Sequence, residues 1–216
     1  MAAPDIAGLD ARALSRLAAR RGPLRVALLA ALCGLPAMTL AFDASIRSAS
    51  EPAEAAIRES GLWALRLFLL SLGVEPLLRR AGIRVSRSVT RTLGLATLAY
   101  ALLHVALYVG FELPGSPAKW LGELTRQPYL IVGLASLFCL LAVSIGARRL
   151  ARRAEGRRAL QRLCEAGGSL ALLHFLWATD LGATALVLYS GALIFVLALR
   201  WTARRPRERA IEEAVA

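Results

Sequence analysis

The chain has 216 residues, of which 57% are hydrophobic, and its mean hydropathy is +0.55. That apolar share is higher than soluble domains usually carry and is typical of a polytopic membrane protein. The formal net charge is +12, but the basic residues form clusters that alternate with apolar segments. This alternation indicates membrane topology and argues against a nucleic-acid-binding surface.

Six apolar segments predict membrane-spanning helices, because about 20 apolar residues are needed to cross the hydrocarbon layer. In chain order they cover about 24–42, 61–78, 92–111, 129–146, 164–179 and 183–201. No small-residue cleavage site follows the first segment, so we interpret it as a retained span and not as a signal peptide. The fifth segment is the weakest, because Glu165, Gly167 and Gly168 interrupt it. We expect an all-α fold: a six-transmembrane-helix bundle that forms one domain over residues 1–216.

The basic residues predict the orientation of these spans. If the N-terminus is cytoplasmic, the segments on that side are 1–25, 79–91, 148–162 and 200–209, and they hold 22 arginines. The three opposite connections hold four basic residues, and Arg66 lies within a span. Positive charge collects on the cytoplasmic side, so the pattern predicts six crossings with both termini cytoplasmic. Trp120 and Tyr129, on either side of a short outer loop, are expected to be interfacial anchors.

The chain has only two histidines, His104 in the third span and His174 in the fifth. They follow the last basic residues of their cytoplasmic loops, Arg91 and Arg162, by 13 and 12 residues. At about 1.5 Å per residue both imidazoles are expected at matching depth, in the outer half of the membrane. Matching depth on two parallel helices suits bis-histidine ligation of a haem iron. The alternative is that each imidazole only hydrogen-bonds to a neighbouring helix.

Two further charges lie in the second span. Arg66 is predicted to lie in the outer half, where it either pairs with a haem propionate or extends to the outer interface. The residues alone do not decide between these two roles. Glu75, at the inner end, is expected to pair with an arginine of the 79–91 loop. No acidic residue or cysteine joins the histidines at their depth, so a tetrahedral metal site is not expected.

An ordered set of motifs resembles the MsrQ family, also called YedZ, over about residues 24–202. The motifs are Gly61-Leu-Trp-Ala-Leu-Arg66, then Gly94, Tyr100, Leu103-His104 and Tyr108, then Thr125-Arg-Gln-Pro-Tyr-Leu-Ile-Val-Gly133, then His174-Phe-Leu-Trp177. The resemblance implies a ferric-reductase-like transmembrane domain in the bacterial inner membrane. It also implies that the chain is the haem b-binding subunit of a system that repairs oxidised methionine in periplasmic proteins.

The same resemblance implies the partners. Electrons are expected from quinol or a cytoplasmic flavin reductase, and they are expected to pass to an MsrP-like, molybdenum-containing periplasmic reductase. The chain is then an electron-transfer subunit and not the catalytic one. FMN or a quinone is implied as a further carrier, without assignable residues here. The family usually has another histidine on the fifth helix, where this chain has Gln161, so one haem is expected.

Two alternatives remain open. The first is a ferric or cupric reductase that uses the same haem helices on a small external acceptor. The second is a non-haem membrane assembly factor or transporter, in which both histidines are structural. Transporters usually contain paired broken helices or an inverted repeat, and the sequence shows neither.

Overall fold

The described part of the chain is entirely helical, as the sequence predicts. The computed structural model describes residues 23–24, 26–40, 52–83, 85–113, 115, 117–150, 152–179 and 182–215. A first helix covers Val26–Leu40. It is followed by α2 (Pro52–Arg80), α3 (Arg87–Phe111), α4 (Pro117–Arg126), α5 (Pro128–Leu150), α6 (Ala154–Ala178) and α7 (Ala183–Val215).

Local sequence signals explain where several helices begin. Pro52, Pro117 and Pro128 are the first residues of α2, α4 and α5. Proline suits this position because the first helical N–H has no intrahelical acceptor in any case. The side chain of Ser86 caps α3 by accepting a hydrogen bond from the backbone N–H of Ser88 at 3.2 Å.

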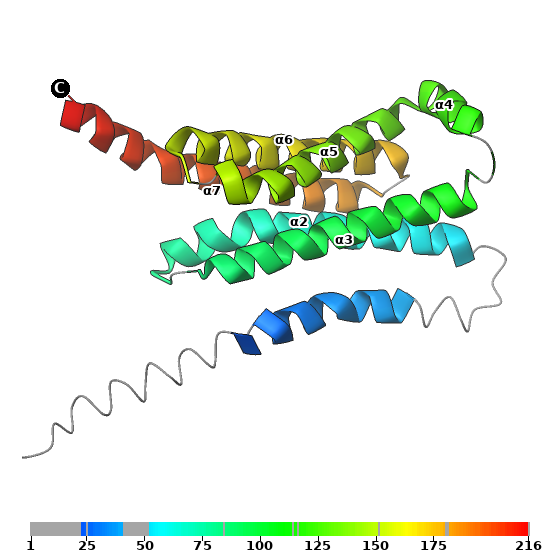
Figure 1. Cartoon of the computed structure of the whole chain (residues 1–216), viewed down its shortest axis with the longest axis horizontal. Helices are drawn as coiled ribbons and strands as arrows, with labels where there is room; N and C mark the ends of the chain where they lie inside the picture. Colours follow the sequence, from blue (N-terminus) through cyan, green and yellow to red (C-terminus); the bar gives the residue numbers. More distant parts are fainter. Residues whose placement is uncertain are drawn as a thin grey trace, which may run out of the picture.

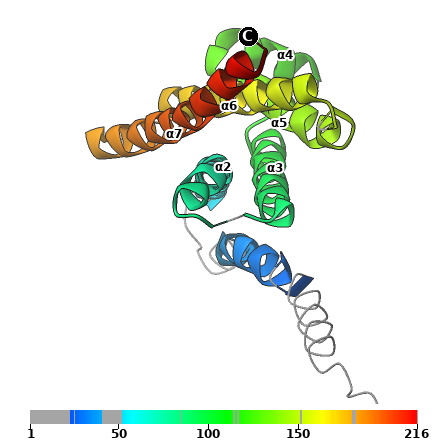
Figure 2. The ribbon, with the colours of Figure 1, turned by 90° about the vertical axis from the view of Figure 1, so that its left-hand side faces the viewer.

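The long helices lie side by side, and successive ones run in opposite directions (Figure 1). As a result α3 and α6 run in the same direction. Seen along the bundle, the pair α2 and α3 lies between the helix Val26–Leu40 and the group α5, α6 and α7 (Figure 2). The short helix α4 lies at the end of the bundle where α3 ends and α5 begins.

Four helices of the described chain are long and apolar enough to cross a membrane, namely Ala53–Arg80, Arg87–Phe111, Pro128–Ala147 and Ala183–Thr202. Many of their large apolar side chains are turned outward: Phe138, Ile145 and Val187 are 67%, 71% and 70% exposed. Such an apolar exterior is a liability in water and the normal state in lipid. Length and composition thus support four of the six predicted spans. The other two coincide with the shorter helix Val26–Leu40 and with α6, which carries charges in its first half.

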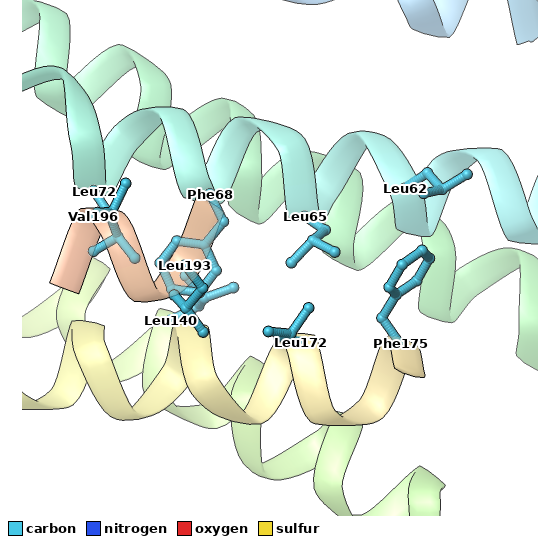
Figure 3. Close-up of a cluster of buried hydrophobic side chains, with 9 residues drawn as sticks. All are labelled: Leu62, Leu65, Phe68, Leu72, Leu140, Leu172, Phe175, Leu193 and Val196. Atoms are coloured by element: carbon cyan, nitrogen blue, oxygen red, sulfur yellow. The ribbon is translucent and has the colours of Figure 1, made fainter. Parts of the chain in front are cut away.

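The core lies between α2 and the helices α5, α6 and α7 (Figure 3). Its buried members are Leu62, Leu65, Phe68 and Leu72 of α2, Leu140 of α5, Leu172 and Phe175 of α6, and Leu193 and Val196 of α7. Spacings of three and four residues place the α2 members on one face of that helix. On the far side of the bundle, the Tyr100 hydroxyl of α3 donates to the Cys33 carbonyl at 2.9 Å, which attaches the first helix.

Helix α6 packs closely on its neighbours through Gly167 and Gly168. A Cβ atom added to Gly167 would lie 3.0 Å from Cβ of Cys139, and one added to Gly168 would lie 3.0 Å from Cδ1 of Leu72. The Ser136 hydroxyl of α5 donates to the Gly167 carbonyl at 2.9 Å. Small residues permit this approach between membrane helices. The glycines that weaken the fifth apolar segment are therefore its packing surface.

A polar junction joins α2, α6 and α7 in the other half of the bundle. Proline has no N–H, so Pro76 leaves the Leu72 carbonyl without its usual helical donor. Nη1 of Arg200 donates to that carbonyl at 3.0 Å, and Nε of the same residue lies 2.9 Å from a Glu165 carboxylate oxygen. The Arg200 and Glu165 side chains are only 14% and 20% exposed. The junction thus fixes α6 against α2 and α7.

Candidate functional site

The structure brings the two histidines together. His104 reaches from α3 and His174 from α6, and their ring centroids are 6.2 Å apart with an angle of 74° between the ring planes. Both residues are half-buried. His104 and His174 lie near the C-terminal ends of α3 and α6, and these two helices run in the same direction (Figure 1). The short helix α4 lies at the same end of the bundle.

Each imidazole is fixed by a backbone carbonyl of the neighbouring helix. Nδ1 of His104 lies 2.8 Å from the carbonyl oxygen of Ile57 in α2, and Nδ1 of His174 lies 2.8 Å from that of Tyr129 in α5. A carbonyl oxygen can only accept, so Nδ1 carries the proton in both rings. Nε2 is then the atom with a free lone pair. Metal-binding histidines have this arrangement, in which the second ring nitrogen donates to a fixed acceptor.

The distance between the rings fits one metal ion held between them. A bond from an imidazole nitrogen to a metal is about 2.0–2.1 Å long, and the nitrogen lies roughly 1.1 Å from the ring centre. Two rings that shared one ion in line would have centres about 6.3 Å apart, which is close to the 6.2 Å between these two centroids. No group of three or more His, Cys, Asp or Glu that could hold a metal lies within the described chain. Two axial imidazoles suit a metal whose other ligands belong to a macrocycle, as in haem.

A polar chain connects the site to α4. The Tyr129 ring lies 5.8 Å from the His174 ring. The Tyr129 hydroxyl donates to the side chain of Gln127, whose amide donates to Glu123 of α4. Nε1 of Trp120 also ties α4 to the end of α3, by donating to the Leu113 carbonyl at 2.9 Å. The sequence predicts Tyr129 only as an interfacial anchor, whereas in the structure it contacts His174 through both its carbonyl and its ring.

Arg66 lies beside the site and not in contact with the imidazoles. In the described structure its Nε donates to the Tyr189 hydroxyl at 3.0 Å, and its guanidinium carbon lies 4.9 Å from the centre of the Trp63 ring. The Tyr189 ring packs edge-on against the Phe175 ring, with 5.3 Å between the ring centroids. Phe175 directly follows His174 in the sequence. The side chain of Arg66 is exposed, so its charge points away from the core.

The remaining predicted charges are placed as follows. Glu75 pairs with Arg79 at 2.7 Å, which confirms the expected pairing with an arginine after the second span. Gln161 is exposed near the start of α6, 13 residues before His174. About 20 Å of helix separates the two positions, so Gln161 is remote from the paired imidazoles.

Sequence reasoning identified the two histidines but missed the groups that hold them. Ile57 and Tyr129 act through backbone carbonyls, and a carbonyl has no sequence signature of its own. A signal does exist beside them, however: the two accepting residues precede their histidines by 47 and 45 residues. In each case a glycine, Gly61 or Gly133, follows the acceptor by four residues.

The fold and the site define a helical, multi-pass membrane protein with two imidazoles paired between helix hairpins. Residues 60–158 match the family model "Ferric reductase like transmembrane component". The chain is 34% identical over 155 residues to the "Protein-methionine-sulfoxide reductase heme-binding subunit MsrQ" of Xanthomonas axonopodis pv. citri (strain 306), covering 70% of each chain. It is also 34% identical over 168 residues to the subunit of the same name from Xanthomonas campestris pv. campestris (strain B100), covering 74% of this chain and 76% of the relative.

The chain belongs to the MsrQ family. This confirms the resemblance that its motifs indicate. No solved structure matches the chain significantly.

Proposed function

We propose that this chain is the haem b-binding electron-transfer subunit of a protein-methionine-sulfoxide reductase system in the bacterial inner membrane. In this proposal His104 and His174 are the axial ligands of one haem. The observation that carries it is the pair of imidazoles with Nδ1 bound to carbonyls and ring centres 6.2 Å apart. The names of the relatives, which describe a heme-binding subunit, support the same assignment.

The residues around the site have distinct roles in this proposal. Haem, when bound, supplies an iron that accepts and releases one electron at a time. His104 and His174 would hold this iron through their Nε2 atoms. The Ile57 and Tyr129 carbonyls hold the ring orientation and make the imidazoles more basic ligands. Arg66 supplies a positive charge beside the site that suits a haem propionate, with Tyr189 holding the guanidinium.

We propose that residues 1–216 form a single domain that crosses the membrane six times, with both termini cytoplasmic. The alternating helix directions support this topology (Figure 1). Helix α6 lies among helices of membrane length and is itself 25 residues long. The 22 arginines on one side and the four basic residues on the other support the orientation.

The proposed orientation places the histidines near the periplasmic side. His104 lies seven residues before the end of α3, and His174 lies four residues before the end of α6. These spacings correspond to about 6–10 Å of helix. A carrier at this depth suits an MsrP-like, molybdenum-containing partner in the periplasm. The inner half then needs another carrier, FMN or a quinone, which accepts electrons from quinol or a cytoplasmic flavin reductase.

The experiment is electron transfer across vesicles that contain the purified chain. Vesicles loaded with quinol should reduce an external MsrP-like reductase, which then reduces protein-bound methionine sulfoxide. Vesicles with His104→Ala or His174→Ala should fail, whereas Gly191→Ala, on the open face of α7, should match the unmodified chain. Transfer at the unmodified rate in either histidine variant would contradict the proposal. Reduction of ferric citrate without reduction of the partner would favour the ferric reductase alternative.

A further inference from the structure

The two histidines are held by the same device, built twice. One copy joins α2 to α3 and the other joins α5 to α6. In each hairpin the first helix offers a carbonyl and the second offers the imidazole, with a distance of 2.8 Å between Nδ1 and the oxygen in both. The four residues on which the device depends are two acceptors and two ligands. They come from four different helices, and each copy forms when the two helices of its own hairpin pack together.

Helix geometry shows which residue can crowd the donor at each acceptor. The carbonyl of a helical residue points toward the residue four positions later, and the side chain at that later position covers the turn before it. A Cβ there can therefore enter the space of a ring that approaches the carbonyl from a neighbouring helix. In this chain the positions are Gly61, four residues after Ile57, and Gly133, four residues after Tyr129.

The structure shows how closely a Cβ atom at either glycine would approach the imidazole. A Cβ atom added at Gly61 would lie 3.0 Å from Nδ1 and 3.1 Å from Cε1 of His104. One added at Gly133 would lie 2.8 Å from Nδ1 and 2.9 Å from Cε1 of His174. An imidazole is rigid, so the whole ring must move. The conflict is greater at Gly133 than at Gly61.

We propose that Gly61 and Gly133 are positioning residues, which uncover the Ile57 and Tyr129 carbonyls so that both imidazoles are held as Nδ1–H tautomers for axial ligation. This inference rests on the proposed haem ligation. Neither glycine touches the metal in this account, and each acts only through a histidine. The bond to the carbonyl also strengthens the imidazole as a donor to iron, which favours the oxidised metal.

The proposal predicts an ordered set of defects in Gly61→Ala and Gly133→Ala. Both variants should lose low-spin haem in purified protein, and Gly133→Ala should lose more. Any haem that remains should have a higher midpoint potential than in the unmodified chain, because the ligand is less basic without its carbonyl partner. Alanine is the better helix former by about 1 kcal/mol, so weaker helices cannot explain such a loss. Gly191→Ala, which meets no atom within 4 Å, is the matched control.

Each outcome decides one question. Suppose that the unmodified chain has a bis-histidine spectrum and that both glycine variants keep its haem content and midpoint potential. This result would overturn the inference and leave the proposed function intact. An unmodified chain without haem would instead defeat the proposed function. An equal loss of haem in Gly191→Ala would also overturn the inference, because the effect would not then be specific to the two acceptors.

A second measurement avoids the question of misfolding. In His174→Gly, added imidazole should restore a low-spin spectrum by occupying the vacated position. 4-Methylimidazole keeps an N–H for the Tyr129 carbonyl, whereas 1-methylimidazole, of the same size, has none. We expect at least a several-fold weaker restoration by 1-methylimidazole. Equal restoration by both methylated ligands would show that the carbonyl bond is not used.

Discussion

Replacing Arg200 by methionine tests how the junction of α2, α6 and α7 is held. Arg200→Met keeps an unbranched apolar stem but removes the guanidinium. The 2.9 Å ion pair with Glu165 is then lost, and the Leu72 carbonyl loses the donor that substitutes for the N–H missing at Pro76. Removing one member of a buried pair costs about 3–5 kcal/mol, and a hydrogen bond from a charged donor contributes about 1.5–3 kcal/mol.

These two effects overlap, and both side chains keep some exposure, so we expect the free energy of unfolding to fall by about 3 kcal/mol. Equilibrium unfolding in mixed detergent micelles, followed by helical circular dichroism, measures the difference. Arg79→Met is the control, because Arg79 and its partner Glu75 are 67% and 45% exposed. A surface pair of that kind contributes about 0–1 kcal/mol.

Pro76→Ala tests separately the hydrogen bond from Arg200 to the Leu72 carbonyl. Alanine restores the N–H that the Leu72 carbonyl normally receives within a helix. Arg200→Met should therefore cost about 1–2 kcal/mol less in the Pro76→Ala background than in the unmodified chain. If Arg200→Met is no more harmful than Arg79→Met, the junction does not stabilise the bundle. If its cost is independent of Pro76, the carbonyl bond contributes nothing.

Three further predictions follow from the proposed topology and site. Periplasmic reporter fusions near residues 50 and 118 should be active, and those after residues 85, 155 and 210 inactive; an active fusion after residue 155 would mean that the fourth span does not cross. The 74° angle between the His104 and His174 rings should give a strongly anisotropic low-spin EPR signal, whereas a rhombic signal would indicate near-parallel imidazoles. Arg66→Gln should retain haem but lower its midpoint potential, because a positive charge beside it favours the reduced form; an unchanged potential would argue against an electrostatic role for Arg66.

The sequence predicts the helical class and the apolar segments well, but it does not predict where the helices end. Hydropathy marks the part of a helix inside the membrane, and a helix can continue into water. For this reason α2 begins at Pro52 and α6 at Ala154, before their apolar segments, and α7 continues to Val215. The helix α4 was not predicted, because its sequence is typical of a short loop. Pro117 nevertheless suits the first position of a helix.

For the proposed site, the sequence identifies the two histidines but not the groups that hold them. Two histidines that follow their basic clusters by 13 and 12 residues predict that the imidazoles lie at similar depth, because helix rise converts residue number into depth. The Ile57 and Tyr129 carbonyls could not be predicted in the same way. Which carbonyl faces which ring depends on the rotation and tilt of adjacent helices, and those are set by side-chain packing in the whole bundle. The position of the Arg66 side chain depends likewise on Tyr189, a residue 123 positions away.

The most direct test of the central claim is the haem content and optical spectrum of the purified chain, compared with His104→Ala and His174→Ala. We predict about one haem b per chain with a low-spin, six-coordinate spectrum, since the sequence holds only two histidines. Each variant should lose that spectrum while still inserting in the membrane. A chain without a Soret band, or either variant with a full low-spin spectrum, would contradict the claim that these two imidazoles hold one haem between them.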